Sequence, residues 1–316
     1  MVDLGGLTKE KVVADDDLKT EFTKQVIQAV QLIEDPEVLA RLEDVAHRKR
    51  FIPQSEETDE QIEDRIRERF EVIDMMTIGA VTGDIKAFVA SGPGGTGKSW
   101  TVESCLLRMY DGIDQTDAPY GQAYRIEKGY SRATDLYRSL WHTRFKGCTL
   151  VLDEADTLWY DPIALPLLKA VLDTTRWRTA KWGSEWKGYD DDDLPIPRRF
   201  EYEGSIIFLT NTDLFSLAAR NNRMSPHLEA LLSRTHYIDT TMRNRRDYIV
   251  RMKQAIKDGM LSELEDQQRQ DVVDFIIQHQ DRLREVSLRM AIKIADLRKL
   301  NEKRWRSACE AMCLKG

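Results

Sequence analysis

No feature of this sequence constrains the fold as strongly as its glycine-rich run GPGGTGKS, at residues 92–99. The run fits the pattern G-x-x-x-x-G-K-[ST], and it lies between an apolar segment, 87–90, and a stretch, 100–110, that suits a helix. Glycines allow successive backbone N–H groups to converge on phosphate oxygens, and the N-terminus of the following helix adds its dipole. The sequence therefore predicts a phosphate-binding loop between a buried strand and a helix.

Two side chains of this loop carry chemistry of their own. Lys98 is predicted to span the β and γ phosphates, and the Ser99 hydroxyl is predicted to ligate Mg²⁺. The expected cofactors are therefore ATP and Mg²⁺. The residues expected to bind them are Gly92, Gly94, Gly95, Thr96, Gly97, Lys98, Ser99 and, from the next motif, Asp153.

A second apolar segment, 149–152, ends in two carboxylates, Asp153 and Glu154. Ligands bind at the carboxyl ends of strands in open parallel sheets, so both side chains should face the bound nucleotide. We expect Asp153 to complete the Mg²⁺ shell together with Ser99. Glu154 is predicted to act as the general base, or to position the water that attacks the γ-phosphate.

A third apolar segment, 205–209, is followed by Asn211. The amide of Asn211 could hydrogen-bond the attacking water or the γ-phosphate. It could equally cap the turn that precedes Asp213, and the sequence leaves both interpretations open.

Two arginines lie farther along the chain. Arg234 follows a helix predicted to begin near Ser225, and it is placed to reach the nucleotide of a neighbouring subunit. A surface ion pair is the alternative, and Arg220 and Arg223 are rival candidates. Arg289 follows the capping residue Ser287 and could reach the γ-phosphate from a helical lid, or it could be a solvated lid residue.

The spacing of apolar residues divides the chain into three parts. Residues 1–75 show helical spacing and are predicted to form an N-terminal helical extension. Between residues 76 and 242, strand-like segments alternate with helical ones, which predicts an α/β core with a parallel sheet. Residues 243–316 show only helical spacing and are predicted to form a small helical bundle.

Composition narrows the class of protein further. The 316 residues are 41% hydrophobic and carry a net charge of -7, and no stretch has the roughly 18 consecutive apolar residues needed to cross a bilayer. The acidic start shows no leader peptide, so we expect a cytoplasmic protein without a membrane partner. The four cysteines are expected to be buried, with no disulfide and no structural metal.

Together these motifs resemble those of the AAA+ ATPases, over residues 70–300. Residues 92–99 match Walker A and 150–154 match Walker B, Asn211 matches sensor 1, Arg234 the arginine finger and Arg289 sensor 2. The resemblance implies a parallel-sheet P-loop core with a helical lid, ATP hydrolysis at subunit interfaces, and a homo-oligomeric ring, usually a hexamer. A first strand region over 70–85 suggests a single-module type found in phages and other mobile elements.

Two segments bear on what ATP hydrolysis would drive. Tyr130 follows a predicted strand, 123–126, where AAA+ proteins place a pore loop, although a plain turn is an equal alternative. Residues 174–200 contain Trp177, Trp182 and Trp186, which suit a projecting β-hairpin. Lys181 and Lys187 beside these tryptophans could meet a nucleic-acid strand, whereas the acidic run 190–193 disfavours such contact.

The leading functional hypothesis is a ring-forming, Mg²⁺-dependent ATPase that remodels or translocates a macromolecule, either DNA or protein. The alternative is an ATP-switched loader or adaptor for a replication or recombination partner, which would turn over slowly and dock through residues 1–75. A small-molecule phosphotransferase would keep the Lys98 loop but leave Arg234 and the lid unexplained.

Overall fold

The computed structural model describes residues 57–111, 123–129, 132–175, 177–183, 188–190, 193–220 and 223–315. The chain divides into two compact units, Met1–Glu57 and Thr58–Gly316, and the elements below belong to the second. The helices expected before residue 57 lie outside the described residues.

A five-stranded parallel sheet forms the centre of the described core, with the strand order β2-β3-β6-β1-β7. The strands are β1 Ala87–Ser91, β2 Tyr124–Lys128, β3 Thr149–Asp153, β6 Ser205–Thr210 and β7 His236–Asp239. The apolar segments that predicted strands at 87–90, 149–152 and 205–209 are thus confirmed as β1, β3 and β6. The edge strand β7 was not expected, because its first and last residues are polar and exposed; among the described strands it pairs with β1 alone.

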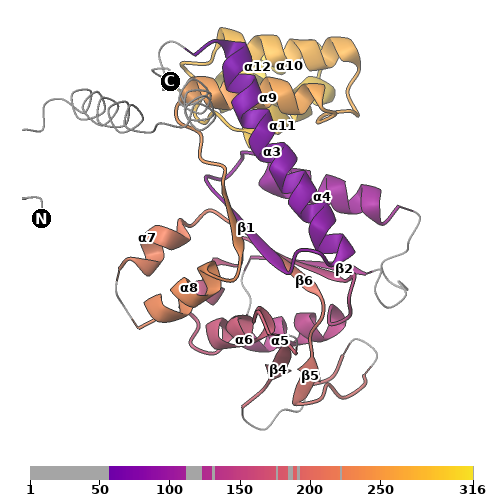
Figure 1. Cartoon of the computed structure of the whole chain (residues 1–316). Coiled ribbons are helices and arrows are strands. Elements are labelled where there is room, and N and C mark those ends of the chain that lie inside the picture. Colours follow the sequence, from indigo (N-terminus) through magenta and orange to yellow (C-terminus); the bar gives the residue numbers. More distant parts are fainter. Residues whose placement is uncertain are drawn as a thin grey trace, which may run out of the picture. The chain divides into compact units, whose positions relative to one another are not determined.

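Helices cover both faces of this sheet (Figure 1). Phe88 and Ala90 of β1 point to the face that α3 and α4 cover, whereas Ala87 and Val89 point to the opposite face. Successive side chains of a strand point to opposite faces of the sheet. Since helices cover both faces, residues 87–90 of β1 are all buried, and all four are apolar. The helices of the core are α3 Asp59–Thr82, α4 Lys98–Met109, α5 Ala133–His142, the 3₁₀ helix η1 Asp156–Tyr160, α6 Ala164–Val171, α7 Leu214–Ala218 and α8 Ser225–Leu232.

Helix α3 corrects one prediction and confirms another. The helical spacing at Ile62, Ile66, Phe70 and Ile73 is borne out, since all four are buried on one face of α3. The first strand region expected over 70–85 is wrong, because α3 continues to Thr82 and ends at Gly83. The predicted domain boundary at residue 75 therefore falls inside this helix.

Four helices after β7 pack into a separate hydrophobic cluster, which we call the lid. They are α9 Arg245–Lys257, α10 Asp266–Gln278, α11 Leu288–Leu300 and α12 Trp305–Cys313. The helical bundle predicted for residues 243–316 is thus present. Asn244 caps α9 and Ser287 caps α11, each by accepting a hydrogen bond from a backbone N–H three residues later.

A β-hairpin is present in the segment 174–200, where one was predicted. Strand β4 Thr179–Lys181 pairs antiparallel with β5 Arg199–Glu201 and forms a separate two-stranded sheet. Trp182 is buried against Tyr137, with ring centroids 5.3 Å apart, and cannot stack on a nucleic acid. Trp177 remains 62% exposed, and Trp186 and Lys187 lie outside the described residues.

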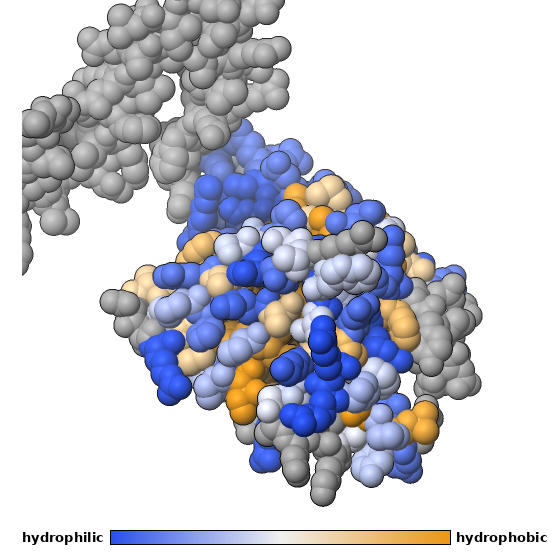
Figure 2. Space-filling view, turned by 60° about the horizontal axis from the view of Figure 1, so that its bottom comes forward, coloured by the Kyte–Doolittle hydropathy of each residue, from blue (hydrophilic) through white to orange (hydrophobic). Residues whose placement is uncertain are grey.

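Figure 2 brings the bottom of Figure 1 forward, and hydrophilic residues predominate on that face with smaller hydrophobic groups among them. The four cysteines are all buried and free, as expected. In the described part of the chain, no helix is long and apolar enough to span a membrane.

Candidate nucleotide site

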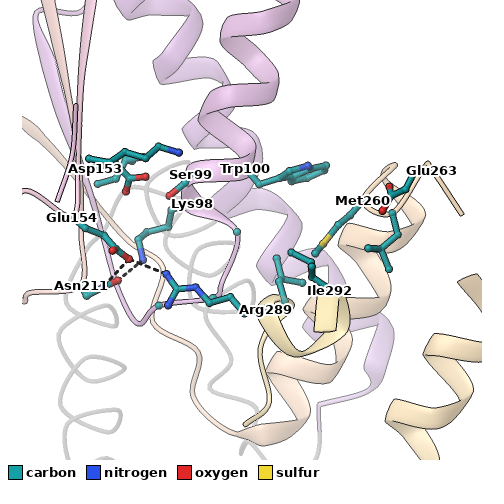
Figure 3. Close-up of a pocket in the computed structure, with 17 residues that line it drawn as sticks. Lys98, Ser99, Trp100, Asp153, Glu154, Asn211, Met260, Glu263, Arg289 and Ile292 are labelled. Carbon is teal, nitrogen blue, oxygen red and sulfur yellow. Dashed lines mark hydrogen bonds and ion pairs between the residues drawn. The ribbon is translucent and has the colours of Figure 1, made fainter. Parts of the chain in front are cut away.

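A cavity of about 540 Å³ opens at the carboxyl end of the sheet, between the core and the lid (Figure 3). Its walls come from the loop 94–99, the ends of β2, β3 and β6, and the lid segments 260–263 and 288–292. Most of the predicted site residues line it, namely Gly94, Gly95, Gly97, Lys98, Ser99, Asp153, Glu154, Asn211 and Arg289.

The loop between β1 and α4 has the close packing that its glycines predict. Gly97 has φ 101°, and a Cβ there would lie 2.8 Å from Leu288 Cδ1 of the lid. Gly92 has φ 143°, and a Cβ there would lie 2.4 Å from Thr240 Oγ1. A side chain at either position would therefore displace the loop, because L-residues rarely adopt these φ values.

The loop holds the ammonium group of Lys98 over its own carbonyls. Lys98 Nζ donates to Gly92 O at 2.6 Å, to Pro93 O at 2.9 Å and to Asn211 Oδ1 at 3.2 Å. Burial lowers the pKa of Lys98 to about 8, although Asp153 and Glu154 pull it upward. A bound polyphosphate would favour the charged form of this lysine.

We expect ATP affinity to fall as the pH rises through about 8, because the free protein then loses the proton on Lys98 that phosphate binding requires. Below that pH the lysine is charged and affinity should be nearly constant. Isothermal titration with ATP between pH 6.5 and 9.5 measures the dependence. Lys128→Gln is the matched control and should keep it, because a hydrogen bond to Glu103 raises the pKa of Lys128. A flat profile in the wild-type protein would contradict the assignment to Lys98.

Asp153 and Ser99 fit a divalent cation. Asp153 is 6% exposed, and burial raises its pKa, while a hydrogen bond from Ser99 opposes that shift. A buried carboxylate beside a hydroxyl supplies the hard oxygen ligands that Mg²⁺ prefers, and a cation would offset the cost of burying the charge. The two predicted metal ligands are therefore adjacent, as the motif spacing implied.

Glu154 directly follows β3 in a conformation that few residues adopt. Its φ is 55°, in the left-handed region, and its backbone N–H donates to Leu209 O at 2.9 Å. The strained backbone turns its carboxylate into the cavity, where Glu154 Oε1 accepts hydrogen bonds from Arg289 at 2.8 Å and Asn211 at 3.4 Å. The hydrogen bond from Arg289 lowers the pKa of Glu154, so the group is ionised at neutral pH.

Asn211 lies between the lysine and the glutamate. Its Oδ1 accepts from Lys98 and its Nδ2 donates to Glu154, so one amide joins the phosphate loop to the acidic strand end. Asp213, not Asn211, caps α7, because its carboxylate accepts from Phe215 N and Ser216 N. Asn211 therefore lies in the cavity, in contact with both Lys98 and Glu154, and its role there stays a prediction.

The lid contacts the phosphate loop directly. Leu288 N donates to Gly95 O at 2.9 Å, and the guanidinium of Arg289 lies beside Gly94. Since Ser287 caps α11, the first turn of this helix points its arginine into the cavity, as Figure 3 shows. The prediction that Arg289 reaches back from the lid agrees with this position.

Arg234 lies away from the cavity. Its NH1 donates to Ala230 O at 2.6 Å, and its Nε is 4.0 Å from Asp173 Oδ1. It would have to leave these contacts to serve a neighbouring subunit. Arg220 and Arg223, the rival candidates, are exposed in the segment between α7 and α8. Tyr130 lies outside the described residues.

Sequence inspection missed several residues at this site. An apolar shelf at one end of the cavity is formed by Trp100, Met260, Leu261 and Ile292. Arg251 of α9 is 2% exposed, stacks 3.6 Å from the centre of the Phe70 ring and donates to Thr96 O at 3.2 Å. No local pattern marks these residues, because they meet only when the lid folds against the core.

The observed arrangement establishes a P-loop α/β fold. A parallel sheet places a glycine-rich loop between β1 and α4, and the paired carboxylates end a strand on the same edge. No family model matches this sequence.

Two crystal structures of NtrX from Brucella abortus, in complexes with ADP and with ATP, show some likeness to the chain. Their TM-scores are 0.39 and 0.32, and their identities are 11% and 13%. The likeness covers 92% and 79% of this chain but only 57% and 49% of the NtrX chains, so the chain spans about half their length. Such low TM-scores support no inference about function.

A curated relative is far more similar in sequence. The chain is 30% identical over 257 residues to an "Uncharacterized 36.7 kDa protein in nrdC-mobD intergenic region" of Enterobacteria phage T4. The similarity covers 80% of this chain and 76% of the phage protein. Because it extends over most of both sequences, the chain belongs to the family of this phage T4 protein.

Proposed function

We propose that this protein is an AAA+ ATPase that hydrolyses ATP with Mg²⁺, assembles into a ring and uses the reaction to remodel or translocate a macromolecule. One observation carries the proposal. Four side chains from four elements, Lys98, Asn211, Glu154 and Arg289, form a continuous chain of hydrogen bonds at the mouth of the phosphate loop.

Each of these side chains has a role in the proposed reaction. The backbone N–H groups of residues 94–99 and Lys98 would bind the phosphates. Glu154 would orient the attacking water and accept its proton, with Asn211 holding that water in line. The hydrogen bond from Arg289 lowers the pKa of Glu154, so the carboxylate is ionised and free to accept that proton. Arg289 would leave Glu154 for the γ-phosphate, whose charge competes for the guanidinium.

Mg²⁺ held by Ser99 and Asp153 would neutralise charge on the phosphate oxygens. The apolar shelf would receive the base and ribose. Trp100 directly follows the proposed Mg²⁺ ligand Ser99 in α4, and both side chains line the cavity. A cavity of about 540 Å³ falls in the usual range for sites that enclose a small-molecule ligand.

The oligomeric part of the proposal concerns Arg234. This residue does not line the cavity of its own subunit. Head-to-tail packing of subunits in a ring, with a hexamer favoured, would bring it to the phosphates bound by a neighbouring subunit. Arg234 on α8 would then stabilise the charge on the transferred phosphoryl group in trans.

A mixing experiment tests the proposal. ATPase rates and native masses are measured in ATP and Mg²⁺, with and without single-stranded DNA, duplex DNA or unfolded protein. Arg234→Ala and Glu154→Gln should each be inactive alone, and mixing them should restore part of the activity, because each supplies what the other lacks. A fully active Arg234→Ala variant, or an inactive mixture, would reject the trans role of Arg234. Slow turnover that no polymer stimulates would instead indicate an ATP-switched loader.

A further inference from the structure

Asp156 is the first residue of the 3₁₀ helix η1, two residues after Glu154, and both of its carboxylate oxygens accept hydrogen bonds. Oδ1 accepts from Thr210 Oγ1 at 2.5 Å and from Trp159 Nε1 at 3.1 Å, and Oδ2 accepts from Thr212 Oγ1 at 3.0 Å. The contact to Trp159 is local, but the two threonines are 54 and 56 residues away in sequence. Asp156 therefore joins the end of β3 to the end of β6.

The two threonines are the residues on either side of Asn211. Thr210 Oγ1 also accepts from Thr212 N at 3.0 Å, which tightens the backbone around Asn211 into a small loop. From the other side, Ser91 Oγ donates to Thr212 O at 2.9 Å and Gly92 N donates to Thr210 O at 3.2 Å. The backbone that carries Asn211 is thus held by η1 on one side and by the end of β1 on the other.

Asn211 itself is exposed to the cavity and makes longer contacts, at 3.2 Å to Lys98 and 3.4 Å to Glu154. Contacts at or just beyond the long end of the usual hydrogen-bond range hold a side chain weakly, so the position of Asn211 also depends on the loop beneath it. Hydrogen bonds to the residues that carry a functional side chain set its orientation. Loss of these hydrogen bonds is expected to lower the rate of the reaction step.

We propose that Asp156 is a positioning residue. It holds Thr210 and Thr212 so that the amide of Asn211 stays between Lys98 and Glu154, where the attacking water must sit. The inference rests on the proposed ATPase function, and it adds a residue that touches neither nucleotide nor metal ligand. Asp156 would act chiefly on the reaction step, because its own hydrogen bonds are to Thr210, Thr212 and Trp159 and not to residues of the phosphate loop.

Asp156→Ala is expected to lower kcat about 10- to 100-fold, the usual effect of a reacting group displaced by about an ångström, while the KM for ATP changes less than about twofold. Asp156→Asn should lose less, because its remaining oxygen still accepts from one threonine. Asp213→Ala is the matched control. It removes a nearby carboxylate that caps α7 and should leave kcat unchanged.

A double-mutant cycle separates positioning from general stability. In an Asn211→Ala background, Asp156→Ala should cost no further activity, since the residue it positions is already gone. Additive losses, or an Asp156→Ala variant with wild-type kcat, would overturn the proposal. If Asp156→Ala does not fold, Thr212→Val removes one of the same hydrogen bonds with little change in shape and should lower kcat in the same direction.

The proposal can fail separately from the ATPase function. If the wild-type protein hydrolyses no ATP, the proposed function is rejected, but crystal structures of the wild-type protein and of Asp156→Ala still test the positioning role. The expected result is that Asn211 Oδ1 lies near Lys98 Nζ in the wild-type crystal and leaves it in the variant. An unmoved Asn211 would overturn the positioning role.

Discussion

Lys98→Ala is expected to abolish detectable ATP turnover and to weaken ATP binding by at least about 100-fold, which corresponds to roughly 2.7 kcal/mol. The physical reason is the position of the ammonium group. Lys98 Nζ lies over the carbonyls of Gly92 and Pro93, at the centre of the loop that would surround the phosphates. The variant loses the cation in this loop, and the neighbouring carboxylates Asp153 and Glu154 then repel the phosphates without opposition.

Titration calorimetry with ATP and Mg²⁺, together with a phosphate-release assay, measures both effects. Folding should survive the change, because the lysine is buried and its charge is costly to bury. The unfolding temperature of the variant should therefore not fall by more than a few degrees. Lys257→Ala, an exposed position on α9, is the control for loss of a positive charge. Unchanged affinity in Lys98→Ala would remove the basis of the nucleotide site.

Glu154→Gln is expected to retain ATP binding while hydrolysis falls about 10²- to 10⁴-fold, the usual contribution of a general base. Glutamine keeps the shape and still accepts a hydrogen bond from Arg289, but it cannot take a proton from water. ATP binding should be as tight as in the wild-type protein or tighter. In the wild-type protein the Glu154 carboxylate forms an ion pair with Arg289, and the neutral glutamine would compete less with the γ-phosphate for that guanidinium.

Single-turnover hydrolysis and ATP affinity, measured on the same preparation, separate these two steps. Native mass measurement in ATP would show whether the stalled variant accumulates as an assembled ring. Glu310→Gln, on the exposed side of α12, makes the same chemical change far from the cavity and should behave as wild type. Normal turnover in Glu154→Gln would show that another group prepares the water.

The core strands and the phosphate loop were predictable because their signals are local. Apolar runs at 87–90, 149–152 and 205–209 are buried on both faces, as strands of a covered parallel sheet must be. The incorrect prediction of a strand region over 70–85 also has a local cause. The residues there include β-branched and aromatic side chains that suit a strand, but their burial follows the helical period set by Ile62 and Ile66.

A hairpin within 174–200 was predictable, but the pairing of its two strands was not. Alternation from Trp177 to Trp186 indicated a strand there, and β4 pairs with a strand that begins at Arg199. The pairing is decided by burial of Ala180 and Phe200 against the core, a contact between segments about 20 residues apart. Periodicity within one segment holds no information about such a partner.

Local sequence was enough to identify the phosphate loop, the paired carboxylates and the arginine at the start of α11, because each depends on neighbouring residues and on a helix or strand end. Tertiary structure alone placed Asn211 between Lys98 and Glu154, stacked Arg251 on Phe70 and joined Asp156 to two threonines. Those contacts join segments that are dozens of residues apart or more, and they form only when parallel strand ends meet at one edge and the lid closes over them. The residue types that would bind phosphate are thus recognisable from consecutive positions in the sequence. The arrangement of side chains that would position a water molecule depends on the whole fold.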